Sequence, residues 1–541
     1  MDSENWPTNP DVRGAVDRIA AMCDARFTTK VELDTVSTTC STLHFDFDFE
    51  EERSRRMFSN TTLNPTDIDL EQGASGPSPT AKLEDTCATL SYEDIREREA
   101  THPVPPKAGT RVRRYLQWGF FSVYRRLFGF VFTVNVLILI TLLAQKHSSR
   151  VGLTHANAAT AASANLCVAI SFRNEHVVNL MFLVATSVPH SLPLSVRRIF
   201  ARIYGYGGIH SGCSVAAVAW YLVFAGLVTR DSLDGALKSR TIVATTYVIL
   251  SLLISILVFA HPYMRIRLHN YFENVHRLAG WTAVGLFWTQ TIVVGTVAAK
   301  IDEEALGKVL VQTPTFWFLI VITCCIVYPW ARTRSRKVRP EYLSEHAIRL
   351  HFDYARVGTG YALRLSDAPL KETHSFAAIA NPERQNGFSV VVSNAGDWTK
   401  RMIQDPPARL WVRGTPTIGV LRVALLFKCV VIVATGSGIG PCLSLFNSKP
   451  DHPVRILWST PNPEATYGRG IIDSVLRADP NAVIVDTRKT GRVDMVGLTY
   501  SLYKEANAEA VVIISNPKVT RKVVSGMNTR GIPAFGPIFD S

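Results

Sequence analysis

The amino-acid sequence predicts an α-helical membrane bundle of six transmembrane helices, followed by a small antiparallel β-barrel and an α/β doubly wound parallel sheet. Three observations lead to this fold class. Six apolar segments, each near the length that spans the hydrocarbon core of a bilayer, lie between residues 126 and 330. Alternating apolar and polar residues, typical of antiparallel strands, follow from about residue 345. From residue 429 onward, short buried-strand runs alternate with helical stretches.

Composition narrows the class of protein. The chain has 541 residues, room for roughly two to four domains, and 47% of its residues are hydrophobic. We assign the formal net charge of +13 to Lys and Arg beside membrane helices, because no basic patch with interleaved aromatic residues predicts a nucleic-acid site. The nine cysteines are scattered without a CxxC pair, so neither a disulfide framework nor a zinc site is predicted.

Residues 1–115 are predicted to be a mostly disordered cytoplasmic tail. They lack long apolar periodicity and contain the turn-rich stretch GASGPSPT and the proline-rich stretch THPVPPKAG. The acidic-aromatic run LHFDFDFEEE at 43–52 is interpreted as solvated, with a docking motif as the alternative. The polar, acidic start predicts no cleavable signal peptide.

A membrane domain is predicted at 116–332. The loops before the first apolar segment, between the second and third, between the fourth and fifth, and after the sixth are strongly basic, whereas the other three are less so. The positive-inside rule therefore places both termini in the cytoplasm of a plasma-membrane or endomembrane protein. The expected segments lie near 126–144, 161–186, 210–229, 241–260, 278–299 and 313–330.

The soluble part is predicted to hold a β-barrel-like domain at 333–427 and an α/β domain at 428–541. In the first, HAIRLHFDYARVGTGYALRLS alternates apolar and polar residues. In the second, buried strands alternate with helical stretches, as in a doubly wound parallel sheet. The strands expected there lie at 429–434, 454–458, 482–487 and 510–515.

A glycine-rich loop follows the first of those strands. Thr435 ends the strand, and Gly436, Gly438 and Pro441 form the pattern GxGxxP. Glycines at the carboxyl end of a strand let the backbone approach a pyrophosphate, whose charge is favoured by the N-terminus of the following helix. The position between a buried strand and a helix predicts nucleotide binding, with a merely tight turn as the alternative.

The pattern GxGxxP resembles the nicotinamide module of the ferredoxin-NADP reductase superfamily, which implies NAD(P)H and an upstream barrel that binds FAD. In ETHSFAAIA, His374 and Phe376 match the His-Pro-Phe flavin motif of ferric reductases and NADPH oxidases, with Ser375 replacing the proline. SNAGDWT resembles the loop that holds the flavin phosphates in the family. Gly396 and Thr399 are the matching positions there.

The far end of the nicotinamide module departs from the family. Ser515, Asn516 and Pro517 stand where ferredoxin reductases usually carry Cys-Gly-Pro, so we expect hydride transfer to be altered or lost. No residue is assigned as catalytic. Candidates for binding the 2′-phosphate of NADP, none singled out by a motif, are Arg455, Arg488 and Arg492.

Six helices before a flavin and nicotinamide module are the layout of the ferric reductase and NADPH oxidase superfamily. In that family, helices three and five each carry two haem-ligating histidines about 14 residues apart. Here the third segment has His210 and, 14 residues later, Phe224, and the fifth has His276 and, 14 residues later, Gln290. The resemblance implies at most one inner haem b, held by His210 and His276. The alternative is that both histidines make interfacial hydrogen bonds.

The second apolar segment carries charged residues in SFRNEHVV. Arg173 and Asn174 match an Arg-Asn step of the family's second helix. A charge inside a membrane segment is expensive and usually functional. We therefore expect Arg173 to pair with Glu175 or, alternatively, with a haem propionate.

The stretches RNEHVVNL, YGYGGIHSGC, VATGSGIGP and RGIPAFGPIFDS together resemble the fungal Tmp group of membrane flavoproteins. A similar region forms the membrane-anchored carboxyl half of certain fungal adenylate-forming, peptide-synthetase-like proteins. The resemblance implies a membrane oxidoreductase that passes electrons from NAD(P)H through FAD to an unknown cytoplasmic-side acceptor, in sporulation-type developmental signalling or secondary metabolism. The alternative is a catalytically weak, nucleotide-binding membrane sensor that acts through a signalling partner.

Overall fold

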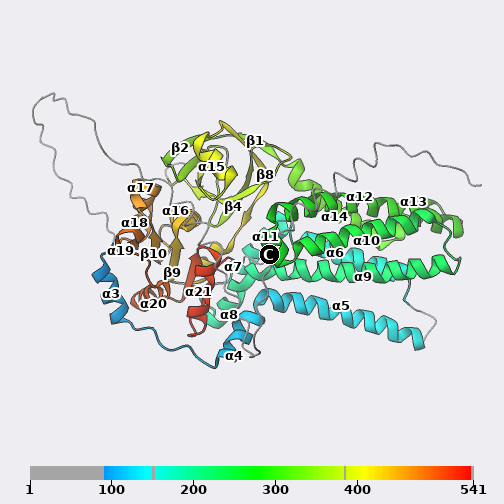
Figure 1. Ribbon diagram of the computed structural model, residues 1–541, viewed down its shortest axis with the longest axis horizontal. Helices are drawn as coiled ribbons and strands as arrows, with labels where there is room; N and C mark the ends of the chain where they lie inside the picture. Colours follow the sequence, from blue (N-terminus) through cyan, green and yellow to red (C-terminus); the bar gives the residue numbers. More distant parts are fainter. Residues whose placement is uncertain (1–89, 149–152, 383–385, 538–541) are drawn as a thin grey trace, which may run out of the picture. The chain divides into compact units, whose positions relative to one another are not determined.

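The computed structural model describes residues 90–148, 153–382 and 386–537. Most of the expected tail, including the acidic-aromatic run, lies outside these residues. Along the described chain, long helices come first, two antiparallel sheets follow, and a parallel sheet flanked by helices comes last (Figure 1).

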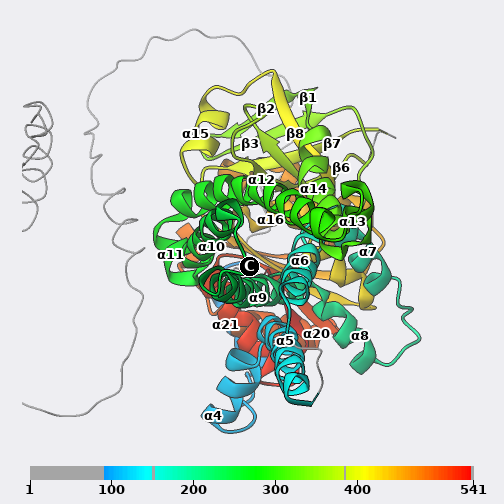
Figure 2. The same ribbon diagram turned by 90° about the vertical axis from the view of Figure 1, so that its right-hand side faces the viewer.

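Long apolar helices occupy the region predicted to be a membrane domain, and Figure 2 views them nearly end-on. In the described chain, five helices are long and apolar enough to cross a membrane, or up to six if a bent helix pair is one span. The helices of this region are α5 (Val123–Ser148), α6 (His155–Ser171), α7 (Glu175–Thr186), α8 (Leu194–Phe200), α9 (Gly207–Leu233), α10 (Arg240–Ala260), α11 (Pro262–Arg267), α12 (His269–Ile301), α13 (Leu306–Gln312) and α14 (Pro314–Ala331).

The segment predicted at 161–186 is a bent pair of helices rather than one continuous helix. The axes of α6 and α7 differ by 67° across the break at residues 172–174. Asn174 caps the N-terminus of α7, and its side-chain oxygen accepts a hydrogen bond from the backbone N–H of His176 at 3.0 Å. Asparagine side chains compete with continued helix in this way, so a new helix starts here. Arg173 therefore lies in the break.

Two glycines let α9 approach α5 closely. A Cβ atom on Gly208 would lie 2.1 Å from the carbonyl oxygen of Tyr124, and one on Gly212 would lie 3.0 Å from that of Phe128. Small residues permit such contacts between apolar helices. The GGIHSG stretch is thus explained by packing between helices.

In the described chain, two antiparallel sheets follow α14 and share an apolar core that includes Leu350, Leu363, Val390 and Trp398. One has the order β1-β8-β4-β5 and the other β2-β3-β7-β6. They occupy the segment predicted to be barrel-like. The elements are β1 (Arg334–Lys337), β2 (Arg339–Ser344), β3 (Ala347–Phe352), β4 (Tyr361–Ser366), β5 (His374–Ala377), β6 (Ile379–Ala380), β7 (Phe388–Ser393), α15 (Asp397–Gln404) and β8 (Arg409–Ile418).

The last domain is built on a parallel sheet with the order β11-β10-β9-β12-β13. The first strand, β9, lies in the middle, and the strand order reverses there. This arrangement confirms the predicted doubly wound sheet. The elements are β9 (Val430–Thr435), α16 (Ile439–Ser448), β10 (Val454–Thr460), α17 (Pro463–Tyr467), α18 (Arg469–Ala478), β11 (Val483–Asp486), α19 (Thr487–Thr490), α20 (Met495–Glu505), β12 (Ala510–Ile514), α21 (Pro517–Asn528) and β13 (Ala534–Phe535).

The described end of the expected tail is folded. It forms α3 (Tyr92–Thr101), α4 (Arg111–Arg114) and a π-helical turn, η1 (Tyr115–Phe120). Helix α3 packs against α20 of the parallel-sheet domain. The Arg98 guanidinium pairs with the Glu505 carboxylate at 2.7 Å. Backbone hydrogen bonds from Leu90 N to Ile484 O and from Ala108 N to Thr529 O hold the rest of this segment on the same domain.

Candidate functional site

The glycine loop after β9 requires glycine at both positions of its pattern. Gly436 has a φ of +51°, which side chains rarely adopt. A Cβ atom on Gly438 would lie 2.1 Å from the carbonyl oxygen of Ile514 in β12, closer than any real contact. The loop therefore crosses directly over the end of the neighbouring strand.

This loop lies where a doubly wound sheet binds ligands. Thr435 is the last residue of β9, the strand at which the order reverses, and α16 begins directly after Gly438. A ligand at such a switch point lies outside the carboxyl ends of the strands and faces the N–H groups of a helix N-terminus. Pro441 stands in the first turn of α16, where a missing N–H leaves no helical hydrogen bond unmade.

A buried tryptophan side chain binds the backbone of the glycine loop. The Nε1–H of Trp458 donates a hydrogen bond to the carbonyl oxygen of Gly436 at 3.1 Å. The Trp458 ring meets the Tyr467 ring edge-on at 5.4 Å, and both side chains are buried. Sequence reasoning missed Trp458, because an aromatic residue on a buried strand is expected to be a core residue. Its contact with the glycine loop depends on the folded position of that loop.

On the β12 side of the loop, two hydroxyl groups are joined. Thr435 Oγ1 and Ser515 Oγ lie 2.5 Å apart, linking the ends of the two central strands. Asn516 caps α21 through a hydrogen bond from the Val519 backbone N–H at 3.0 Å. The residues that replace the family's Cys-Gly-Pro thus serve the local structure of this strand end.

His374 and Phe376 are oriented by the pairing of β5 with β4. His374 is opposite Leu365, and Phe376 is opposite Leu363. Directly paired residues share a face of the sheet, and both leucines are buried in the barrel core, so the two aromatic side chains face inward. Above them, the Trp398 ring stacks at 4.4 Å from the His374 ring and 5.7 Å from the Phe376 ring.

Two polar atoms in this stack lack a partner. Among the described residues, nothing hydrogen-bonds to the buried His374 Nε2 or to the buried Trp398 Nε1. Unpaired buried polar groups are costly, and they occur at sites that a ligand completes. The stack therefore fits a ligand with hydrogen-bonding ring atoms, such as a flavin. Sequence reasoning treated Trp398 only as part of the loop motif.

The loop from Ser393 to Thr399 is closed by hydrogen bonds to one hydroxyl group. The hydroxyl oxygen of Thr399 accepts hydrogen bonds from the backbone N–H groups of Ala395 at 2.8 Å and Gly396 at 3.0 Å. A Cβ atom on Gly396 would meet only open space. The amides expected to hold flavin phosphates are thus turned toward Thr399, and a phosphate would take the place of its hydroxyl.

The two halves of the candidate site adjoin. Helix α16, which carries Pro441, packs against β5 and β6 of the barrel. The Gly360 backbone N–H donates to Ser444 Oγ at 2.8 Å, and the Asn447 side-chain amide donates to the Ala380 carbonyl oxygen at 3.1 Å. The glycine loop and the His374 strand are thereby fixed on neighbouring elements.

The three arginine candidates for a 2′-phosphate are separated by the fold. Arg455 lies at the amino end of β10, away from the loop, and its guanidinium binds both carboxylate oxygens of Asp479 at 2.7 Å. It is therefore unsuited to the nucleotide. Arg488 and Arg492 follow β11, at the same edge of the sheet as the glycine loop.

In the helix bundle, His210 and His276 lie near each other. The His210 Nδ1–H donates to the Ala169 carbonyl oxygen at 2.8 Å, which leaves Nε2 with the lone pair that an iron ligand needs. Both imidazoles and the Arg173 guanidinium interact electrostatically. The hydrogen bond to Ala169 agrees with the alternative that these histidines make ordinary hydrogen bonds, and haem binding by His210 and His276 stays a prediction.

The outer position is filled with packed side chains. Gln290 accepts a hydrogen bond from the Tyr221 hydroxyl at 2.9 Å and donates one to Thr246 Oγ1 at 2.8 Å, and all three residues are buried. The Phe224 ring lies 5.4 Å from the Tyr221 ring and belongs to the same core. The residues at both predicted outer positions therefore have structural roles.

A buried carboxylate pairs with an arginine of the barrel where α7 meets β8. Glu175, 1% exposed, pairs with Arg364 of β4 and not with Arg173, because the helix break turns Glu175 toward the barrel. The predicted Arg173–Glu175 pair is wrong. Arg364 and Arg413 are cross-strand neighbours, an unfavourable like-charge pair. Burial, and then Arg364 and Arg277 nearby, lower the pKa of Arg413 to about 10.

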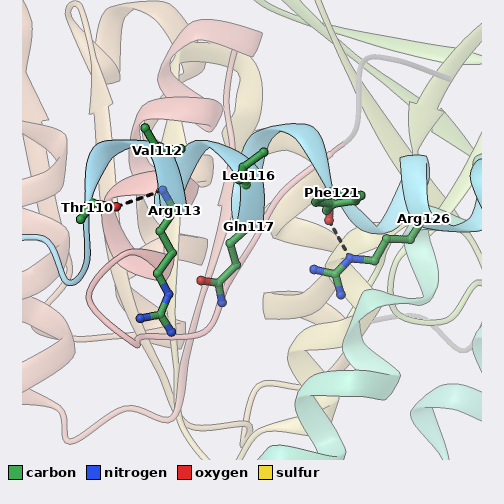
Figure 3. Close-up of a pocket in the computed structure, with 7 residues that line it drawn as sticks. All are labelled: Thr110, Val112, Arg113, Leu116, Gln117, Phe121 and Arg126. Atoms are coloured by element: carbon green, nitrogen blue, oxygen red, sulfur yellow. Dashed lines mark hydrogen bonds between the residues drawn. The ribbon is translucent and has the colours of Figure 1, made fainter.

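An amphipathic segment precedes α5. In Figure 3, Arg113 and Gln117 extend from one side of α4 and η1, and Val112 and Leu116 project from the other. The side chains line a shallow pocket of about 570 Å³ that continues to Arg126. Val112 and Leu116 are exposed.

Comparison with known proteins identifies relatives over most of the chain. A family model described as the C-terminal domain of adenylate-forming reductase 03009 matches residues 420–541. Adenylate-forming reductase 03009 of Coprinopsis cinerea is 49% identical over 486 residues, 89% of this chain and 46% of that protein. Adenylate-forming reductase 06235 of the same fungus is 47% identical over 441 residues, 81% of this chain and 42% of that protein. The chain spans less than half the length of these curated relatives.

Solved structures are similar to a smaller part of the chain. Phthalate dioxygenase reductase is 15% identical with a TM-score of 0.31, over 38% of this chain and 68% of that one. Ferredoxin-NADP+ reductase from Plasmodium falciparum is 12% identical with a TM-score of 0.30, over 39% of this chain and 97% of that one. The homologues by sequence are thus named adenylate-forming reductases, and the solved structures that resemble this chain include reductases.

Proposed function

We propose that this chain is an integral membrane flavoprotein that oxidises NAD(P)H, reduces FAD and passes the electrons to a cytoplasmic-side acceptor. One observation carries the proposal. The loop at Gly436 and Gly438 lies at the switch point of the parallel sheet, and Gly438 approaches β12 so closely that no side chain fits. A backbone shaped in this way is what a nucleotide pyrophosphate requires.

The chain's own residues would bind and orient both cofactors. The N–H groups at the start of α16 would hold the pyrophosphate of NAD(P)H, and the unpartnered His374 Nε2 and Trp398 Nε1 would meet polar atoms of the flavin. The amides now bound to Thr399 would hold the flavin phosphates. FAD, when bound, accepts hydride from NAD(P)H and can release electrons one at a time.

Membrane insertion and topology are part of the proposal. Helices of sufficient length and hydropathy, counted as six when α6 and α7 form one span, support it. An even number of spans puts both termini on one side, and the basic loops place that side in the cytoplasm, at the plasma membrane or an endomembrane. The amphipathic segment before α5 fits the lipid interface.

Electrons are proposed to stay on the cytoplasmic side. His210 and His276 would hold at most one inner haem b, and the Gln290 network fills the position of an outer one. The relatives are named adenylate-forming reductases. The candidate site supports the reductase activity in that name. The resemblance to the fungal Tmp membrane flavoproteins extends the proposal to redox-linked developmental signalling or secondary metabolism.

One spectrum tests the proposed function. The full chain, purified in detergent, is expected to show flavin absorbance that bleaches on anaerobic addition of NADPH or NADH, with at most one haem per chain. Gly438→Ala is expected to retain flavin and lose the bleaching. Purified protein without flavin would contradict the proposal, and a two-haem spectrum would contradict the confinement of electrons to the cytoplasmic side.

A second candidate function is a nucleotide-binding membrane sensor with weak catalysis that acts through a signalling partner. The hydrogen bond between Thr435 and Ser515 favours it, because it ties the two strand ends between which the nicotinamide would enter. A sensor is expected to bind NAD(P)H and keep its flavin oxidised. Rapid bleaching in a stopped-flow experiment would exclude this candidate.

A further inference from the structure

A pocket of about 430 Å³ opens beside the barrel, where α14 gives way to β1. Arg332, Arg334 and Arg336 line one side of it, and Arg356 lines another. Tyr354, Phe388 and other barrel residues form its apolar wall. The volume lies in the range of small-ligand sites.

The pocket lies away from the loop proposed to hold the flavin phosphates, although its lining includes Leu363, the residue opposite Phe376. Phe388, which lines it, is the first residue of β7. Ser393, the last residue of β7, leads into the loop whose amides bind Thr399. The pocket and the flavin-phosphate loop therefore lie at opposite ends of the same strand.

The charge in the pocket has one sign. Four of the described lining residues are arginines, and none of the described lining residues is acidic. Two of the guanidinium groups are held in place: Arg334 donates to the Ala331 and Thr333 carbonyl oxygens at 2.9 Å, and Arg336 stacks over the Tyr354 ring at 4.2 Å. Arg332 and Arg356 are exposed. Positive charge from several lining residues favours an anionic ligand, and guanidinium groups match the oxygens of a phosphate.

The position of the pocket indicates the source of that anion. Arg332 is the C-cap of α14, one of the helices apolar enough to cross a membrane. The aromatic side chains of Trp281 and Trp330 meet at 5.1 Å near this end of α14, as is common at membrane interfaces. Basic residues just outside a membrane helix on the cytoplasmic side attract anionic lipids.

We propose that this pocket binds the phosphomonoester head group of an anionic phospholipid in the cytoplasmic leaflet, with phosphatidic acid as the simplest example. Arg332 and Arg356 contact the phosphate, and the apolar wall borders the glycerol and upper acyl chain. The proposal rests on the proposed function only in that α14 spans the membrane. Such a lipid holds the barrel against the membrane surface at the point where the chain leaves the membrane.

The test measures binding of short-chain phosphatidic acid, short-chain phosphatidylserine and inorganic phosphate to the detergent-solubilised full chain by thermophoresis. We expect phosphatidic acid to bind more tightly than phosphatidylserine, and both to bind more tightly than inorganic phosphate. Arg332→Gln combined with Arg356→Gln should weaken phosphatidic acid binding roughly 20- to 30-fold, because each arginine near an anionic surface contributes several-fold. Arg339→Gln, an exposed arginine of β2 outside the pocket, should change it less than about twofold.

Three outcomes overturn the proposal. Equal binding by the double variant removes the pocket as the site. Inorganic phosphate that binds as tightly as the lipid makes a free anion the ligand. Flavin absorbance is recorded on the same samples: its loss only in the double variant assigns the pocket to flavin instead. Wild-type protein that lacks flavin but binds phosphatidic acid contradicts the proposed function alone.

Discussion

The Tyr221 hydroxyl donates a hydrogen bond to the side-chain oxygen of Gln290 at 2.9 Å, between the long helices α9 and α12. The side-chain amide of Gln290 donates a second hydrogen bond to Thr246 Oγ1 of α10 at 2.8 Å. The position at which an outer haem ligand would stand thus joins three helices through buried hydrogen bonds.

Replacement of Gln290 by leucine is therefore expected to destabilise the bundle. It leaves the Tyr221 hydroxyl and Thr246 without their partner, at a cost of about 1–3 kcal/mol. The measurement is the thermal unfolding midpoint in detergent. Thr289→Val, at the exposed neighbouring position, is the matched control and should leave the midpoint nearly unchanged. An unchanged midpoint in Gln290→Leu would mean that the network contributes nothing.

Addition of one methyl group to the glycine loop is expected to abolish nucleotide binding. In Gly438→Ala, the new Cβ atom would lie 2.1 Å from the Ile514 carbonyl oxygen, so the loop must move away from β12. Isothermal titration with NADPH measures the loss. Gly470→Ala in α18 is the control, since its Cβ atom would meet only open space. Equal affinities in the two variants would refute the assignment of the loop.

The hydrogen bond from Trp458 to the glycine loop can be tested with a substitution that leaves no cavity. Trp458→Phe keeps a buried aromatic ring but removes the N–H that binds the Gly436 carbonyl oxygen. We expect the affinity for NADPH to fall by about three- to tenfold, which corresponds to one neutral hydrogen bond, and the flavin content to stay the same. A parallel loss of flavin would indicate general damage to the fold.

Acid is expected to weaken the contact between α8 and the parallel-sheet domain. The Arg197 guanidinium binds Glu509 at 2.6 Å, and this hydrogen bond, opposed by burial and aided by the Lys428 backbone N–H, lowers the pKa of Glu509 from 4.5 to about 2. Because the folded pKa is the lower one, the stabilisation is complete above pH 4.5. It is lost as the pH falls toward 2.

Thermal unfolding of wild-type protein and Glu509→Gln between about pH 6 and pH 3 measures this effect, because this range crosses the ordinary pKa of 4.5 and approaches the folded pKa of about 2. The variant should be less stable at the upper end, and the difference should shrink at the lower end. Asp451→Asn serves as a control for the loss of an acidic side chain. A constant difference across the range would show that Glu509 does not titrate as described.

Local patterns predicted the strands and the glycine loop well. The run CVVIVA and the following GSGIGP fix β9 and its loop, because buried-strand composition and glycine spacing depend only on neighbouring residues. The alternation of strands and helices also predicted a doubly wound parallel sheet, and the observed strand order agrees with it. These features required no knowledge of distant contacts.

Pairings over long sequence distances were not predictable. Arg364 as the partner of Glu175 depends on the bend at residues 172–174, and hydropathy does not distinguish a bent helix pair from one span. The inward orientation of His374 depends on which residue of β4 it opposes, and a shift of one residue would reverse it. The contact of Arg98 with Glu505 lies in a segment whose composition alone suggested a tail.

The folded segment at residues 90–108 has a mechanical consequence. It holds the parallel-sheet domain through α3 and two backbone hydrogen bonds, and it continues directly into α4 and α5. The same domain is also linked to the helices through the barrel and α14. The chain therefore anchors the parallel-sheet domain twice, once before α5 and once after β8, so a cut in either stretch would leave the other to hold the domain beside the helices.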